Sequence, residues 1–187
     1  MTHHRARTTN SISTRAFSLV EIVIVLAIVS AFAAIAMPRY AAATARHRLS
    51  AATLRIQSDL AYAIGASRSL AQGRTIRFDA ATDSYTITGL AGLDDPDSAD
   101  YEVRLAHPPY HGDIRLVWFG DDNALAIDGF GVLDSDGAIV ISVGGLYRNI
   151  TVDAASGKTE ARSLTRSEID ALPAQPTIDL LGIGESL

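Results

Sequence analysis

Residues 15–38 read RAFSLVEIVIVLAIVSAFAAIAMP, an apolar stretch that carries one carboxylate, Glu21. From Phe17 to Met37 a helix would measure roughly 31 Å at a rise of 1.5 Å per residue, which matches the hydrocarbon core of a bilayer. The stretch exceeds the apolar region of a secretory signal and lacks an A-x-A-type cleavage site at its far end. We therefore predict that 17–38 is a transmembrane helix that stays in the mature protein.

The charges around this helix predict its orientation. Residues 1–16 carry three arginines and two histidines but no acid. By the positive-inside rule the N-terminus lies in the cytoplasm and the chain after Pro38 lies outside. The arginines at 39, 46 and 48 follow the span closely and weaken this bias.

The carboxylate at Glu21 needs a partner or a function, because a charged side chain costs roughly 2.5–3.5 kcal/mol at the centre of a spanning helix and less near its end. A cut between Ala16 and Phe17 would create an α-amine, largely protonated near neutral pH, one helical turn from Glu21. The alternative is a glutamate that is merely tolerated at the membrane edge.

A short basic leader, a small residue, FSLVE at 17–21 and a proline at the end of the span resemble a type IV pilin-type precursor. The resemblance implies a leader at 1–16 that a prepilin peptidase removes by cutting between Ala16 and Phe17, after which Phe17 is N-methylated. It also implies that Glu21 steers assembly by pairing with the N-terminal amine of a neighbouring subunit, and that Pro38 kinks the helix. The family usually has glycine before the cut, where this chain has alanine.

Beyond Pro38 the helix is predicted to continue over 39–72 as an amphipathic segment that ends at a glycine C-cap, Gly73. Its apolar residues recur at intervals of three and four and predict a seam on which a globular head packs. Arginines and other polar residues, Asp59 among them, fall mostly elsewhere, and a nucleic-acid role for these arginines is the alternative. The seam residues are Ala45, Leu49, Ala52, Ile56, Leu60, Ala63 and Ile64.

From Gly73 the hydrophobic period changes to two. The stretch 74–89, RTIRFDAATDSYTITG, predicts a β-hairpin, and four more strand candidates and a short last strand follow before residue 162. We expect an α+β fold in which the long N-terminal helix packs on a head, 73–162, made of one antiparallel sheet or a pair of sheets. The helix that feeds the first hairpin, 48–78, and the glycine and strand pattern of 128–159 are similar to the GspH/FimT group, the H-class minor pseudopilins of type II secretion. This resemblance implies a pilin-like fold.

Two clusters could bind a metal ion or perform acid–base chemistry. His107, His111 and Asp113 lie close together in sequence, but two prolines between the histidines favour a solvated loop. Asp94, Asp95, Asp97 and Asp100 are weak candidates for calcium ligands, but they lack the glycine and the distal glutamate of an EF-hand, which favours a solvated acidic loop. The chain has no cysteine, no phosphate loop and no G-x-S-x-G motif. We predict no catalytic site, no cofactor and no small-molecule substrate.

The net charge of −5 is unevenly distributed, since residues from Gly73 onward include eight basic and nineteen acidic side chains, a balance of −11. An acidic head repels phosphates, so nucleic-acid binding is not expected. The expected function is that of a minor pseudopilin in a periplasmic filament, anchored in the bacterial inner membrane, with a prepilin peptidase and sibling pseudopilins as partners. The alternative is a FimT-like minor pilin of DNA uptake. A membrane-anchored hydrolase would need activity that depends on His107 or His111.

The last segment, 163–187, is predicted to form a short helix within 163–172, because Thr165 and Glu168 have the spacing of a capping box. Pro173 and Pro176 then favour an extended chain. The run IDLLGI at 178–183 could dock on the head or on a partner, and a chain end without fixed structure is the alternative.

Overall fold

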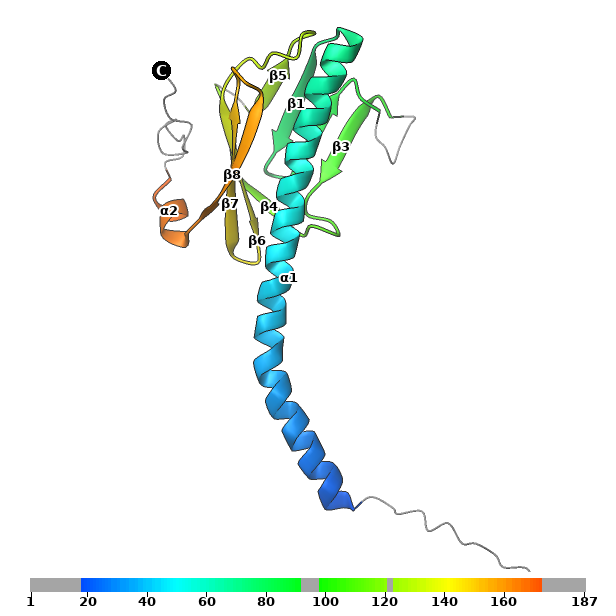
Figure 1. The fold of residues 1–187 in the computed structure, drawn as a ribbon, viewed down its shortest axis with the longest axis vertical. Coiled ribbons are helices and arrows are strands. Elements are labelled where there is room, and N and C mark those ends of the chain that lie inside the picture. The colour runs from blue at the N-terminus through cyan, green and yellow to red at the C-terminus, as the bar shows by residue number, and fades with distance from the viewer. Residues whose placement is uncertain (1–17, 92–97, 121–122, 173–187) are drawn as a thin grey trace, which may run out of the picture. The chain divides into compact units, whose positions relative to one another are not determined.

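The computed structural model describes residues 18–91, 98–120 and 123–172 (Figure 1). The chain divides into two compact units between Tyr40 and Ala41, and each is described by itself. The described part of the first unit is helical from Leu19. The second unit contains the rest of that helix, followed by β-strands and a short second helix.

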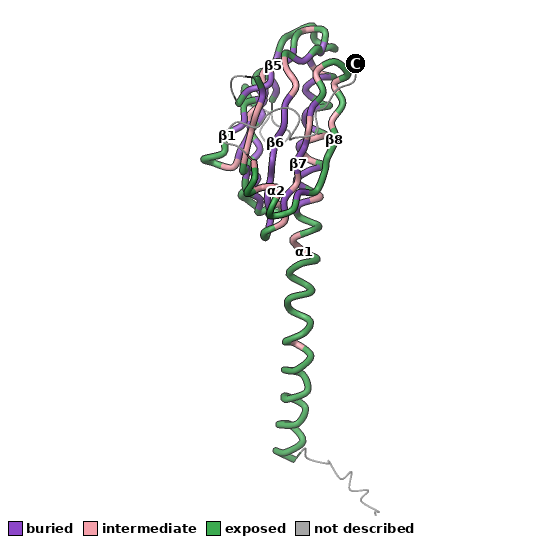
Figure 2. Tube along the Cα trace, turned by 90° about the vertical axis from the view of Figure 1, so that its left-hand side faces the viewer, coloured by how far each residue is buried: buried purple, intermediate pink, exposed green. Residues whose placement is uncertain are grey.

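Helix α1 runs from Leu19 to Leu70. In the first unit its large apolar side chains are exposed (Figure 2). Within the described residues, α1 is the one helix with a stretch long and apolar enough to cross a membrane, and none of that stretch is buried. This finding is compatible with the predicted membrane anchor.

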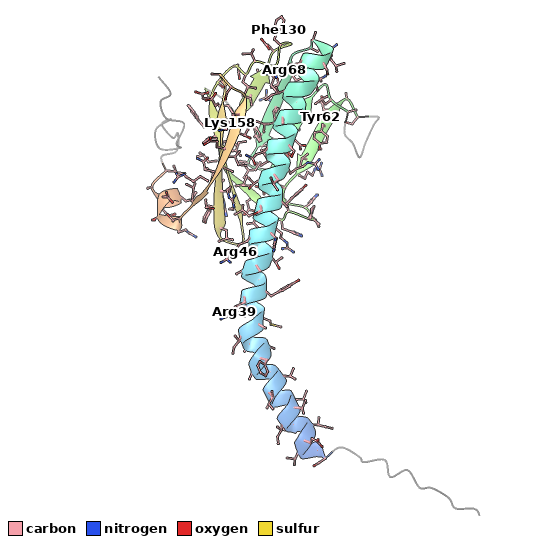
Figure 3. All side chains as sticks on the ribbon, in the orientation of Figure 1. Arg39, Arg46, Tyr62, Arg68, Phe130 and Lys158 are labelled. Carbon is pink, nitrogen blue, oxygen red and sulfur yellow. The ribbon has the colours of Figure 1, made fainter. Side chains whose placement is uncertain are left out.

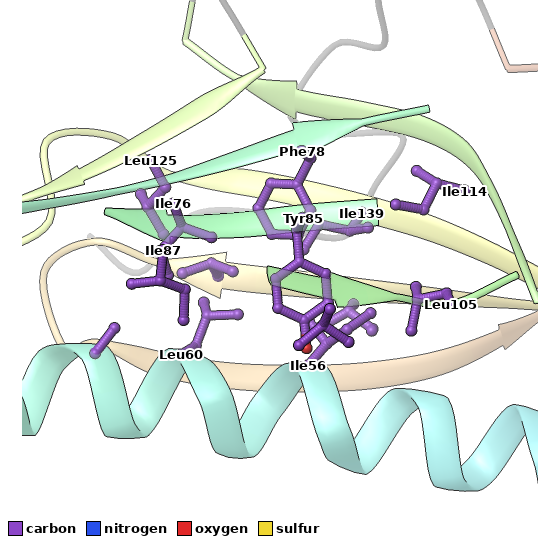
Figure 4. Close-up of a cluster of buried hydrophobic side chains, with 14 of the residues drawn as sticks. Ile56, Leu60, Ile76, Phe78, Tyr85, Ile87, Leu105, Ile114, Leu125 and Ile139 are labelled. Carbon is purple, nitrogen blue, oxygen red and sulfur yellow. The ribbon is translucent and has the colours of Figure 1, made fainter. Parts of the chain in front are cut away.

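The part of α1 in the second unit buries one face. Its buried apolar residues lie mostly three and four positions apart and are those of the predicted seam: Leu49, Ala52, Ile56, Leu60, Ala63 and Ile64. Ala45 is half-buried at the start of the same face. The seam packs against strands, which Figure 4 shows in close-up.

Two four-stranded antiparallel sheets make up the head. The first sheet has the order β3-β2-β1-β5 and the second has the order β4-β6-β7-β8. A pair of sheets clamped on one long helix is the α+β fold that the sequence predicted. The strands are β1 (Arg74–Asp79), β2 (Ser84–Thr88), β3 (Asp100–Arg104), β4 (Asp113–Phe119), β5 (Ala124–Ile127), β6 (Gly137–Val143), β7 (Leu146–Asp153) and β8 (Lys158–Leu164).

The predicted hairpin is formed by β1 and β2. Ile76 pairs with Ile87 and Phe78 with Tyr85, so the apolar positions of both strands point to one face. These side chains meet the seam of α1 and the inward face of the second sheet in one core (Figure 4). Complete burial of an aliphatic or aromatic side chain contributes roughly 1.5–3 kcal/mol each, so this core is the main source of the head's stability.

The end of α1 differs from the prediction in one detail. The residue in the left-handed region is Ala71, with φ of 50°, rather than Gly73. The amide of Gln72 donates to the carbonyl of Ser67 at 3.2 Å, as in a Schellman motif. Gly129 is needed beside this turn, because a Cβ there would lie 3.0 Å from the carbonyl carbon of Ala71.

The sequence did not predict strand β5, and it predicted an end for strand β8 that is too early. Strand β5 was not predicted, because ALAI is short and half alanine, a residue that β-strands disfavour. Strand β5 forms by antiparallel pairing with β1, in which Leu125 lies opposite Ile76. Strand β8 continues to Leu164, beyond the expected end of the head at 162, because its pairing with β7 persists to Tyr147 opposite Leu164.

Helix α2 (Arg166–Asp170) forms within the predicted range 163–172. Its capping box is complete, since the hydroxyl of Thr165 accepts from the amide of Glu168 and the Glu168 carboxylate accepts from the amide of Thr165. Ile169 and Leu172 then pack against a second, smaller apolar cluster of Val140, Tyr147 and Leu164.

Candidate functional site

The exposed apolar face of α1 in the first unit is the strongest candidate for a functional surface. Large apolar side chains from Leu19 to Met37 are at least half exposed. In a monomer in water such a surface would be costly, and surfaces of this kind mark membrane or protein contacts. Glu21 lies in the first helical turn within this surface.

Glu21 has no hydrogen bond or ion pair among the residues that the structure describes. A carboxylate with apolar neighbours on its own helix gains most from a cation supplied by another group. The cleavage residues Ala16 and Phe17 lie outside the described residues. The cut, the methylation and the pairing of Glu21 therefore stay predictions.

Pro38 lies inside α1, and the helix continues beyond it. Because proline has no N–H, it cannot donate the intrahelical hydrogen bond to the carbonyl of Ala34. The position therefore has the local weakness that favours a kink, and the kink itself stays a prediction.

The histidine cluster does not form a site in the described residues. His107 and His111 are exposed in the connection between β3 and β4, as the solvated-loop interpretation predicted. The Asp113 carboxylate accepts instead from the Ser142 hydroxyl at 3.2 Å and pairs with Arg115 at 3.4 Å. It thus joins β4 to β6 and is not held by the histidines.

The acidic candidates for calcium fall mostly on residues that the structure does not describe, since Asp94, Asp95 and Asp97 lie in 92–97. Asp100 begins β3, and its Oδ1 accepts from the amide of Gly89 at 2.9 Å. That oxygen caps the turn after β2. Over the described ranges no group of three or more histidine or carboxylate side chains is placed to hold a metal ion.

A groove of about 640 Å³ lies over the outer face of the first sheet. Its walls carry both signs of charge, with Arg77 and Arg104 beside Asp79 and Glu102. Arg104 and Glu102 pair with each other at 2.7 Å, and both are about half exposed. This arrangement is typical of a solvated strand face and gives no preference for an anion or a cation.

One buried polar cluster was missed by the sequence reasoning. Asp59 lies on the buried face of α1 and is 7% exposed. Its carboxylate accepts from Arg55 at 2.8 Å and from the hydroxyl of Tyr85 at 2.5 Å. Tyr101 contributes a longer bond of 3.4 Å, and Arg55 also donates to the Tyr101 hydroxyl. The cluster ties α1 to β2 and β3.

Electrostatics explain why this cluster is stable. Burial would lower the pKa of Arg55, but the hydrogen bond and the charge of Asp59 outweigh that effect and raise it. Burial first, and then the charge of Asp59, raise the pKa of Tyr85. The Asp59 carboxylate therefore accepts hydrogen bonds from the charged Arg55 guanidinium and from the protonated Tyr85 hydroxyl. A buried charge needs partners of this kind to offset the loss of its hydration.

No family model and no curated protein matches the chain. Two solved structures resemble it, both of the type IV minor pilin FimU of Pseudomonas aeruginosa strain PAO1. The crystal form in space group P21 has a TM-score of 0.47 at 15% identity and covers 65% of this chain and 96% of that one. The form in space group P65 has a TM-score of 0.44 at 13% identity and covers 62% and 97%.

Proposed function

We propose that the protein is a membrane-anchored filament subunit of the type IV pilin kind, and specifically a minor pseudopilin of the H class in a type II secretion system. The observation that carries the proposal is Glu21, a carboxylate unpaired among the described residues and set in an exposed apolar helix. That helix continues into the seam of a β-rich head, and its start overlaps the FSLVE motif at 17–21, which follows the basic leader 1–16.

The proposed assembly follows from these features. A prepilin peptidase removes residues 1–16, and the methylated amine of Phe17 carries a positive charge. In the filament the apolar helix leaves the lipid and packs among the helices of sibling subunits. Glu21 then pairs with the Phe17 amine of a neighbour, which offsets the cost of a carboxylate in apolar surroundings. The role is structural, with no catalytic step assigned to the head.

The proposed location is the bacterial inner membrane, crossed once, with the N-terminus in the cytoplasm and the head in the periplasm. The exposed apolar helix and the basic residues 1–16 support this orientation. The partners are the peptidase, sibling pseudopilins and the lipid bilayer.

The first experiment measures the intact mass of the full chain after coexpression with and without a prepilin peptidase. We expect loss of Met1 to Ala16 and one added methyl group only when the peptidase is present. Ala16→Gly is the matched variant, because it restores the family's usual residue before the cut. If neither wild type nor this variant is cut, the proposed function is wrong. If only the variant is cut, Ala16 blocks processing of this chain, and the proposed assembly, which begins with that cut, is wrong for the wild type.

The alternative function, a FimT-like minor pilin of DNA uptake, needs an exposed basic surface on the head. Of the eight basic side chains of the head, Arg77 is exposed, Arg148 is half-buried and five pair with carboxylates, Lys158 among them (Figure 3). The five are Arg104, Arg115, Lys158, Arg162 and Arg166. Arg74 is 4% exposed and therefore unavailable. A gel-shift titration across salt concentrations separates the two functions, because phosphate contacts produce a steep salt dependence.

A further inference from the structure

The turn at 128–132, in the connection between β5 and β6, is held in one conformation by its own hydrogen bonds. Oδ1 of Asp128 accepts from the amides of Phe130 and Val132, each at 2.8 Å. The amide of Asp128 donates to the carbonyl of Val132 at 2.9 Å, and the amide of Gly131 donates to the carbonyl of Asp128 at 3.0 Å. Gly131 has a φ of 75°, which glycine adopts without a Cβ clash. The backbone of this turn is therefore well defined.

The end of α1 fixes the turn from the other side. Nε of Arg68 donates to the carbonyl of Phe130 at 3.0 Å, and Nη2 of Arg68 donates to the carbonyl of Gly131 at 3.4 Å. A Cβ at Gly131 would lie 2.4 Å from Nε of Arg68, so a side chain there would displace the arginine. Figure 3 shows Phe130 and Arg68 together at the end of the head where α1 ends.

This fixed turn presents apolar side chains to solvent. Phe130 is 83% exposed and Val132 is 55% exposed. Leu70, in the last turn of α1, is 57% exposed, and Gly129 lies against Ala71, the residue after Leu70. We call Leu70, Phe130 and Val132 the turn patch. Because Phe130 is so exposed, it contributes little to the core, and an aromatic side chain on a fixed backbone loses little conformational entropy when a partner covers it.

The size of the turn patch indicates what kind of partner it fits. A fully covered aromatic side chain buries about 150–250 Å², so the three side chains together offer on the order of 300 Å². A stable complex between two free proteins buries about 800 Å² on each partner. The patch is therefore too small to capture a free protein alone. It contributes where the partner is already held nearby by another contact, because tethering raises the effective concentration of the partner.

Arg68 adds a charge beside the turn patch. Its side chain is exposed and, among the residues that the structure describes, donates to the two carbonyls of the turn and pairs with no carboxylate. The Asp128 carboxylate of the same turn accepts from backbone amides instead. A complementary surface therefore combines an apolar pocket for Phe130 with a carboxylate that faces the guanidinium.

We propose that the turn patch docks on the head of a sibling subunit in the same filament, with Phe130 in an apolar pocket and Arg68 facing a carboxylate. This inference rests on the proposed function, because the packing of α1 among sibling helices is what holds the partner nearby. It adds a contact between heads to the contacts of the apolar helix and of Glu21.

Photochemical cross-linking tests the contact directly. Benzoylphenylalanine, a photoreactive analogue, replaces Phe130 in the full chain, which is expressed with the prepilin peptidase and the sibling subunits. We expect irradiation to give an adduct that mass spectrometry identifies as a sibling subunit linked through its head. The same analogue in place of Thr82, in the exposed turn between β1 and β2, is the control and should not give this adduct. No adduct from position 130, or adducts only with exported proteins or with a second copy of this chain, would overturn the proposal.

A second measurement uses Phe130→Ala, which should keep the wild-type urea midpoint because the side chain is 83% exposed. We expect this variant to be cut and methylated like wild type but to be recovered in sheared filaments in several-fold lower amount. Leu54→Ala removes another exposed apolar side chain, outside the turn patch, and should assemble like wild type. If wild type and Phe130→Ala enter filaments equally, the docking proposal is wrong and the proposed function stands. If wild type is neither cut nor found in filaments, both are wrong.

Discussion

The hydroxyl of Tyr85 on β2 donates a hydrogen bond of 2.5 Å to the carboxylate of Asp59 on the buried face of α1. This bond joins the helix to the first sheet at the level of the main core (Figure 4). Arg55 pairs with the same carboxylate one helical turn earlier, at 2.8 Å. The buried charge is thereby neutralised within the head, and it is satisfied by side chains from α1 and from the first sheet.

Removing the Tyr85 hydroxyl tests how much this connection contributes. We expect Tyr85→Phe to lower the free energy of unfolding by about 1–3 kcal/mol, because a buried carboxylate loses its shortest hydrogen bond. Tyr101→Phe is the matched control with a longer bond of 3.4 Å and should cost less. Urea unfolding of the full chain in micelles, followed by Trp118 fluorescence, measures both. Equal losses would contradict the dominant role of Tyr85.

The seam of α1 was predictable from the sequence because apolar spacing reports burial directly. Asp59 was missed because it is charged, although it lies three residues after Ile56 and seven after Ala52, within the same buried face. Its partners Tyr85 and Tyr101 come from strands that are far away in sequence. Spacing could have identified the buried position, but only the fold supplies the partners that make a buried carboxylate stable.

The strands could be predicted where β-branched residues alternate with other residues, as in β1 and β2. The prediction missed β5, because that strand forms through its pairing with β1 and not through the β-propensity of its own residues. The helix end was predicted within a few residues from Gly73, yet the left-handed residue is Ala71. Glu21 was identified from the sequence as the candidate assembly residue, and the structure places it in the first turn of α1, while its role stays a prediction. The leader cut and most of the calcium candidates lie outside the described residues, so those predictions stand as made.

Ala71 provides a second test, because its φ of 50° is a conformation that L-residues adopt at a cost. We expect Ala71→Gly to raise the free energy of unfolding by about 0.5–1 kcal/mol, since glycine adopts this φ without a Cβ clash. Ala61→Gly, at an exposed position inside α1, should lower it by about 1 kcal/mol. The urea midpoints of the two variants should therefore move in opposite directions, and a shift in the same direction would contradict the assigned helix end.

The capping box of α2 predicts a pH dependence. Hydrogen bonds from the amide and hydroxyl of Thr165, and then from Arg162, lower the pKa of Glu168 from 4.5 to about 2. A depressed pKa in the folded state means that the stabilisation is complete above the unfolded value of 4.5 and is lost as the pH falls towards 2. Amide exchange in α2 should therefore accelerate as the pH falls from about 4.5 to about 2, beyond the intrinsic dependence of exchange on pH.

Glu168→Gln is the matched control for this dependence. Its side chain can still accept a hydrogen bond from the Thr165 amide, but it carries no charge to titrate. We expect exchange in α2 of this variant to be faster than in wild type at pH 7 and to lack the additional acceleration between 4.5 and 2. A wild-type profile without that acceleration would show that the Thr165–Glu168 bonds do not hold α2.

Glu21 provides the test of assembly, because a carboxylate among apolar side chains should be retained only for a cationic partner. We expect Glu21→Ala to be cut and methylated like wild type, since the cut lies before Phe17, but to be absent from filaments sheared from cells that express the sibling subunits. Immunoblots of sheared and membrane fractions, together with the intact mass, measure the two steps separately.

Two further variants decide whether the charge itself matters. Glu21→Gln keeps the size of the side chain and should fail to enter the filament as Glu21→Ala does, because an amide cannot form an ion pair with the amine of a neighbour. Val25→Ala changes an exposed apolar residue one turn further along α1 while keeping Glu21, and we expect it to assemble. Since removing the charge also makes the helix easier to keep in lipid, a Glu21→Gln subunit should accumulate in the membrane fraction. Assembly of Glu21→Gln at the wild-type level would show that shape rather than charge selects this residue and would refute the pairing with Phe17.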